Sequence, residues 1–231
     1  MTITFKALGA LLAYPTPELV QALPEIRAAI QAEKRLGVRE RTALFLLLAE
    51  LGHRDLLDSQ EHYVGLFDRG RSTSLNLFEH VHGDSRDRGP AMLDLRGVYE
   101  AAGFAFTANE LPDYLPALLE FLSTQPFARA EEMLGDCAHI LRAIGETLAR
   151  RESPHAAVFA ALLAMVKAEG LAPVKRAAPV VEETPVDDEW VDAPVIFGPA
   201  GAPGGCGAPR PGPSVIQFVP PASSARPGSQ P

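Results

Sequence analysis

Two neighbouring stretches decide the fold: PDYLPALLEFLS, from Pro112 to Ser123, and ARAEEMLGDCAHILRAIGETLAR, residues 128–150. Apolar residues recur in both at the spacing that places side chains on one face of an α-helix. They are Leu115, Leu118, Leu119 and Leu122 in the first stretch, and Ile140, Leu141, Ile144 and Leu148 in the second. These stripes predict helices that each bury one face in a hydrophobic core.

The same helical spacing continues through residues 1–170, and no run of alternating β-branched residues predicts a strand. We therefore predict an all-α fold, a single helical-bundle-like domain of about nine helices. The predicted helices are Thr4–Ala13, Pro17–Glu33, Val38–Leu51, Asp55–Phe67, Leu75–Val81, Ala91–Ala102, Pro112–Ser123, Ala128–Arg150 and Pro154–Glu169.

The composition changes after Gly170, so residues 171–231 form a separate Pro/Gly-rich tail that holds 13 of the 21 prolines. Such a segment buries too little apolar surface to offset its ordering entropy, and we expect most of it to be disordered or extended. Two apolar islands interrupt it, at residues 190–197 (WVDAPVIF, with the only tryptophan) and 215–219 (VIQFV). They are either incidental apolar residues or short motifs that dock on the helical domain or on a partner.

The formal net charge of −8 gives no electrostatic reason to expect binding to nucleic acid. Cys137 and Cys206 are the only cysteines, too few for a disulfide framework or a cysteine-based metal cluster. The N-terminal apolar stretch is shorter and less basic than a signal peptide, and the run Ala43–Leu51 is too short to cross a bilayer. We expect a cytoplasmic protein without stable membrane insertion.

Residues 63–92, YVGLFDRGRSTSLNLFEHVHGDSRDRGPAM, concentrate Arg, His, Asp, Ser and Phe beyond what packing or a solvated helix face requires. One hypothesis is a metal-dependent hydrolase, because His80, His82 and Asp84 form an H-x-H-x-D string. However, two residues at i and i+2 diverge on a helix, and the preceding sequence is typical of a helix. We therefore predict no metal site.

Two other interpretations of this stretch do not involve a metal. Arg69 and Arg71 with the following Ser-Thr-Ser could bind phosphate, but neither glycine-rich nucleotide-binding motif is present. The closely alternating acidic and basic residues can also pair with one another and fix the loops between helices.

The string LFDRGRSTSLNLFEHVHGDSRDRGPAM, followed by LDLRGVYEAAGF and NELPDYLPALLEFLS, resembles the NarJ family of nitrate reductase assembly chaperones. The resemblance covers residues 5–171. The wider group of redox-enzyme maturation chaperones carries an E-x-P-D-H motif, which Glu110–Tyr114 match with tyrosine in place of histidine. Glu110 and Asp113 also suit the positive end of the following helix, so helix capping is an alternative role for this motif.

The resemblance implies a chaperone, not an enzyme. Its client would be the catalytic (alpha) subunit of respiratory nitrate reductase, in complex with the beta subunit and recognised through its N-terminal segment. The chaperone would hold no cofactor stably, would assist loading of molybdopterin guanine dinucleotide into the client, and would delay membrane docking. The residues predicted to form the peptide-binding groove are Asp84, Arg86, Glu110, Asp113, Tyr114, Phe78 and Leu115. A hypothesis from another class is a helical adaptor that acts through its tail.

Overall fold

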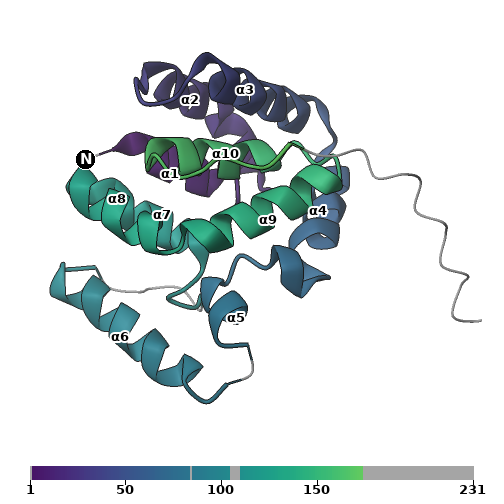
Figure 1. Cartoon of the computed structure of the whole chain (residues 1–231). Coiled ribbons are helices and arrows are strands. Elements are labelled where there is room, and N and C mark those ends of the chain that lie inside the picture. Colours follow the sequence, from purple (N-terminus) through teal and green to yellow (C-terminus); the bar gives the residue numbers. More distant parts are fainter. Residues whose placement is uncertain (1, 84, 105–109, 174–231) are drawn as a thin grey trace, which may run out of the picture. The chain divides into compact units, whose positions relative to one another are not determined.

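Helices make up the secondary structure of the computed structural model, which describes residues 2–83, 85–104 and 110–173. These residues form ten α-helices and no strand, which confirms the all-α prediction (Figure 1). The helices are α1 (Ile3–Ala10), α2 (Pro17–Ala32), α3 (Val38–His53), α4 (Leu56–Tyr63), α5 (Leu77–Val81), α6 (Arg88–Ala101), α7 (Leu115–Thr124), α8 (Phe127–Asp136), α9 (Ala138–Arg150) and α10 (Ala156–Met165). A π-helical turn, η1 (Val64–Asp68), and a 3-10 turn, η2 (Arg71–Thr73), lie between α4 and α5. The predicted tail and its two islands fall outside the described residues, apart from 171–173.

Local sequence signals account for where several helices begin. The Thr16 side chain accepts a hydrogen bond from the Leu19 N–H at 3.2 Å, and Pro17 occupies the first turn of α2, where its missing N–H costs nothing. At the start of α4, the Asp55 carboxylate accepts from the Leu57 N–H at 2.9 Å. These caps satisfy backbone donors that the helices themselves leave unpaired.

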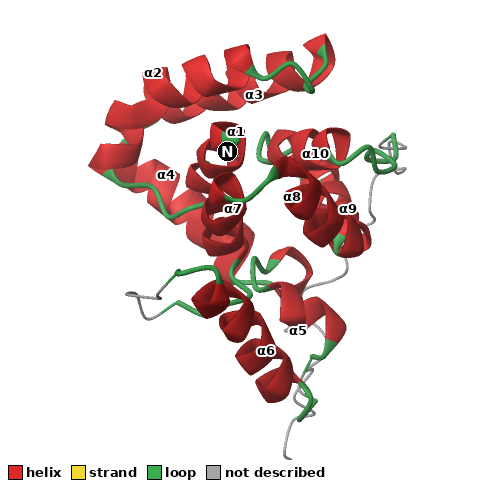
Figure 2. Cartoon of the chain, turned by 90° about the vertical axis from the view of Figure 1, so that its left-hand side faces the viewer, coloured by secondary structure: helices red, strands yellow, loops and turns green. Residues whose placement is uncertain are grey.

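The helices are arranged in layers, with α1, α7, α9 and α10 in the middle (Figure 2). The pair α2 and α3 covers one side of this layer, and α5 and α6 lie on the other. Helices α1 and α7 pack closely, and an added Cβ on Gly9 would lie only 3.2 Å from the Leu119 Cβ. Burial of the apolar faces of these helices is the main stabilising contribution to the fold.

One predicted helix is wrong: residues 128–150 form two helices, α8 and α9, which meet at Cys137. Cys137 has φ −99° and ψ 10°, outside regular helical values. Gly135 disfavours helix in the last turn of α8. The bend still lets Leu134 and Leu141 both reach the core, where each is fully buried. The apolar stripe runs through the bend unchanged, so local periodicity could not reveal it.

No helix among the described residues is both long enough and apolar enough to span a membrane.

Candidate functional site

The two sequence stretches that carry the predicted site residues lie side by side. Asn76 and Tyr114 form an isolated antiparallel bridge, in which the Leu115 N–H donates to the Leu75 carbonyl at 2.8 Å. The Leu77 N–H donates in return to the Asp113 carbonyl at 3.1 Å. These bonds fix the start of α5 against the start of α7. The bridge therefore unites the Arg/His-rich stretch with the Glu110–Tyr114 motif, as the predicted groove requires.

The buried side chain of Asp113 stabilises this bridge. Its carboxylate is 0% exposed, and Oδ2 accepts a hydrogen bond from the Phe78 N–H, in the first turn of α5, at 2.9 Å. The Arg88 guanidinium lies 4.0 Å from the same oxygen, whereas Oδ1 has no hydrogen-bond partner. Burial raises the pKa of Asp113, and the Phe78 N–H and Arg88 oppose that shift by favouring the carboxylate.

Two expectations about this motif are therefore wrong. Asp113, predicted to form part of the groove, is not accessible to a peptide, because its side chain is 0% exposed. Nor does it cap the helix that follows it: α7 begins after Tyr114 without a side-chain cap, and Asp113 caps α5 instead. Leu115 is also fully buried, so it can support a binding surface but cannot contact a ligand there.

Tyr114, which stands where the wider group has histidine, pairs its hydroxyl group with that of the buried Tyr63. The Tyr63 hydroxyl donates to the Leu12 carbonyl at 3.1 Å and lies 3.2 Å from the Tyr114 hydroxyl. Because the Tyr63 proton is committed to Leu12, Tyr114 donates to the Tyr63 oxygen. Burial raises the pKa of both phenols, so Tyr114 stays neutral where a histidine could become charged.

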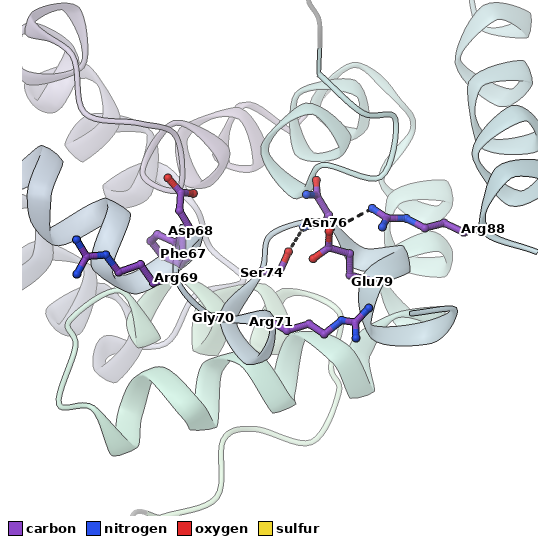
Figure 3. Close-up of a pocket in the computed structure, with 9 residues that line it drawn as sticks. All are labelled: Phe67, Asp68, Arg69, Gly70, Arg71, Ser74, Asn76, Glu79 and Arg88. Carbon is purple, nitrogen blue, oxygen red and sulfur yellow. Dashed lines mark hydrogen bonds and ion pairs between the residues drawn. The ribbon is translucent and has the colours of Figure 1, made fainter. Parts of the chain in front are cut away.

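A polar pocket of about 430 Å³ opens beside the bridge (Figure 3). It is lined by Phe67, Asp68, Arg69, Gly70, Arg71, Ser74, Asn76, Glu79 and Arg88. Arg88, the first residue of α6, bonds Glu79 of α5 at 3.3 Å as well as approaching Asp113. Arginine–carboxylate pairing of the kind predicted for this stretch thus connects α5, α6 and the bridge.

The remaining predicted groove residues differ in accessibility. Glu110 and Arg86 are exposed, and Phe78 and Tyr114 are half-buried, so all four can be reached from solvent. Asp84 lies outside the described residues. Sequence reasoning missed the exposed Val81, next to Phe78 on α5, and the role of Glu79 as a partner of Arg88. Only the closeness of Glu79 to an arginine nine residues later could have suggested that pair.

The histidines of the HVHGD string are used in packing and hydrogen bonding. His80 Nε2 lies 2.9 Å from the Ser74 carbonyl oxygen, and the His82 ring packs edge-on against Phe78 with ring centres 5.6 Å apart. Within residues 2–83, 85–104 and 110–173, no group of three or more His, Cys, Asp or Glu residues could hold a metal ion. The described geometry therefore gives no support to the metallohydrolase hypothesis.

Comparison with known proteins places this arrangement in a family. Residues 16–161 match the family described as nitrate reductase delta subunit. The chain belongs to the nitrate reductase delta subunit family. The resemblance seen in the sequence is thereby confirmed.

Three relatives of this chain illustrate the similarity. The nitrate reductase molybdenum cofactor assembly chaperone NarJ of Escherichia coli (strain K12) is 47% identical over 161 residues, which cover 70% of this chain and 68% of the relative. The probable chaperone NarW of the same strain is 44% identical over 158 residues, 68% and 65% of the two chains. The probable NarJ chaperone of Bacillus subtilis (strain 168) is 34% identical over 169 residues, 73% and 91% of the two chains.

Proposed function

We propose that this protein is a non-catalytic, cytoplasmic chaperone that binds respiratory nitrate reductase while the enzyme acquires its molybdenum cofactor. The client is its catalytic subunit in complex with the beta subunit, and the chaperone recognises the client's N-terminal segment. Binding keeps the apo subunit open for molybdopterin guanine dinucleotide and off the membrane until loading is complete. The chaperone itself binds no cofactor stably and only assists its loading into the client.

The observation that carries this proposal is the backbone bridge between Asn76 and Tyr114. It joins two distant segments that carry accessible apolar side chains, Phe78 and Val81 on one and Leu111 and Tyr114 on the other. An amphipathic helix binds such a surface through its apolar face. The family relationship supports the choice of client, because the relatives carry the names of nitrate reductase chaperones.

The charges next to this surface suit a basic client segment. Glu110 is exposed at the edge of the bridge, and the chain as a whole carries a net charge of −8. Contact between apolar side chains would supply most of the affinity, while Glu110 would orient a basic residue of the peptide.

Calorimetric titration with a peptide of about 15 residues, long enough to form a helix, tests the proposal. The peptide copies the N-terminus of the catalytic subunit from the same host. Leu111 is 45% exposed, so Leu111→Asp should weaken binding without unfolding the chain, and Glu110→Lys should weaken binding to a basic peptide. Val38→Asp, an exposed position on α3 across the central layer, is the matched control and should bind normally.

A cellular assay tests the client relationship independently. In a host that lacks its own chaperone, the wild-type chain should restore nitrate reductase activity and Leu111→Asp should restore less. Peptide binding that is absent in the wild type, or equally strong in all variants, would refute the proposed surface.

A further inference from the structure

Helix α6 has little buried surface compared with the helices next to it in the chain. Of its 14 residues, Tyr99 alone is buried, whereas α7 buries most of its ten residues. Leu95 and Val98 pack against the core but are only half-buried. Figures 1 and 2 place α6 at the edge of the helical unit, beside α5. A helix with so few buried apolar contacts can unfold locally while the rest of the domain stays folded.

Side chains near the two ends of α6 anchor it to the same short segment. Arg88, at the start of the helix, bonds Glu79 at 3.3 Å and lies 4.0 Å from the Asp113 carboxylate. The Tyr99 hydroxyl, about 16 Å further along the helix, donates to the Pro112 carbonyl at 2.8 Å. Both ends of α6 therefore contact the pair of residues that precedes Tyr114 at the bridge.

Glycines on either side of α6 give the backbone freedom to change direction there. Gly83 has φ +55° and Gly103 has φ +79°, and glycine adopts positive and negative φ about equally well. Within α6, Gly97 lowers the stability of the helix itself. The position of α6 in the fold therefore depends on its anchors at Arg88 and Tyr99.

We propose that α6 (Arg88–Ala101) is a strap that opens by local unfolding, and that its closed position orders the client surface. In the closed form the anchors of the strap hold Pro112 and Asp113, so the flanking Leu111 and Tyr114 keep fixed positions. Opening of the strap releases both contacts. A client that binds the ordered surface more tightly also holds the strap closed, because such coupling is reciprocal. The coupling to a client rests on the proposed function, whereas the effect of the strap on the bridge does not.

Gly97 allows the strap to be opened or strengthened without removing a side chain, since the space around it is open. Gly97→Pro breaks the helix next to the Tyr99 anchor and shifts its folding equilibrium by on the order of a hundredfold. Gly97→Ala, the matched control, should slow the opening about fivefold. Amide hydrogen exchange of the full chain measures both. In Gly97→Pro the amides of α6 should lose protection while those of α9 keep it.

The same exchange experiment reports on the bridge without any client. The Leu77 and Leu115 N–H groups donate across the bridge, and the Phe78 N–H donates to the Asp113 carboxylate. All three amides should exchange several-fold faster in Gly97→Pro than in Gly97→Ala. A contribution of α6 to overall stability alone would instead change α9 and the bridge to the same extent.

Titration with the client peptide tests the coupling. Gly97→Pro should bind the peptide about tenfold or more weakly than Gly97→Ala, because only the closed fraction of the molecules presents an ordered surface. In the wild type, bound peptide should slow the exchange of the α6 amides. Gly97→Ala should bind as tightly as the wild type, in which the strap is already closed.

Three results would overturn the proposal. Loss of protection in α9 together with α6 in Gly97→Pro would make α6 part of the core. Bridge amides that exchange equally fast in the two variants would show that α6 does not position the bridge. Equal peptide affinity of the two variants would exclude the coupling to the client. A wild-type chain that binds no peptide would instead refute the proposed function, and the exchange of the bridge amides would still decide whether α6 orders the bridge.

Discussion

The buried carboxylate of Asp113 allows a sharp test of what holds the bridge together. The structure gives it two partners of different kinds: a hydrogen bond from the Phe78 N–H at 2.9 Å and the charge of Arg88 at 4.0 Å. Asp113→Ala removes both partners. Asp113→Asn keeps an acceptor for the Phe78 N–H, removes the charge, and places an amide NH₂ where the partnerless Oδ1 lies.

The expected changes in the free energy of unfolding distinguish the hydrogen bond from the ion pair. Leaving a buried N–H without its acceptor and uncapping α5 should make Asp113→Ala less stable by about 2 kcal/mol. Asp113→Asn should stay within about 1 kcal/mol of the wild type at pH 7, because the charge it loses is poorly solvated and Arg88 still pairs with Glu79. Burial raises the pKa of Asp113, so the wild type should gain stability relative to Asp113→Asn as the pH falls through the pKa of the folded state.

Urea unfolding of the full chain, followed by circular dichroism at pH 7 and again in mild acid, measures these differences. The same variants titrated with the client peptide should show a larger loss of affinity for Asp113→Ala, because Phe78 and Tyr114 lose their fixed positions. If Asp113→Asn were as unstable as Asp113→Ala, the ion pair with Arg88, and not the cap of α5, would be the stabilising contact. That outcome would refute capping of α5 as the main contribution of Asp113.

The remaining predictions concern the helical core. An added Cβ on Gly145 of α9 would lie 2.8 Å from the Phe159 Cβ, so Gly145→Ala should cost about 1–3 kcal/mol. Gly97 of α6 has open space around it, so Gly97→Ala should raise the unfolding free energy by up to about 1 kcal/mol; thermal melts that shift in the same direction for both would contradict this. Burial, together with the smaller effects of nearby His62 and Arg54, lowers the pKa of His155 to about 4. Because this pKa lies below the unfolded value of about 6.5, stability should fall as the pH drops from 6.5 toward 4, by roughly 3 kcal/mol in full. His155→Gln should lose that part of the acid dependence in urea midpoints measured across this range, and equal slopes for both proteins would argue against it.

The proposed client surface beside the Asn76–Tyr114 bridge has few exposed, unpaired acidic side chains among its described residues. In the described part of the bridge region, three acidic residues have different environments. Asp113 is buried, Glu79 pairs with Arg88, and Glu110 is exposed. Apolar contact should therefore contribute more to client affinity than ion pairing, which is weak at exposed positions. Raising the salt concentration should accordingly weaken peptide binding only modestly.

Much of the fold could be predicted from the sequence alone. The spacing of Leu115, Leu118 and Leu122 is local information, because it depends only on the 3.6-residue repeat of the helix. Thr16 and Pro17 likewise mark the start of α2 through contacts within one turn. The family was also evident from the sequence, since its motifs are strings of neighbouring residues, and the candidate stretch was found for the same reason.

The tertiary structure decided what depends on residues far apart in the chain. No spacing indicates that the Asp113 carboxylate caps α5, because Phe78 lies 35 residues earlier and the contact exists only after α5 and α7 have packed. The bend at Cys137 was hidden because the apolar stripe continues through it. Exposure is also a property of the packed chain: Glu110 and Asp113 look equivalent in the sequence, yet one faces solvent and the other is buried. Local periodicity and capping thus determined the helices, while long-range packing determined which of the predicted residues can meet a partner.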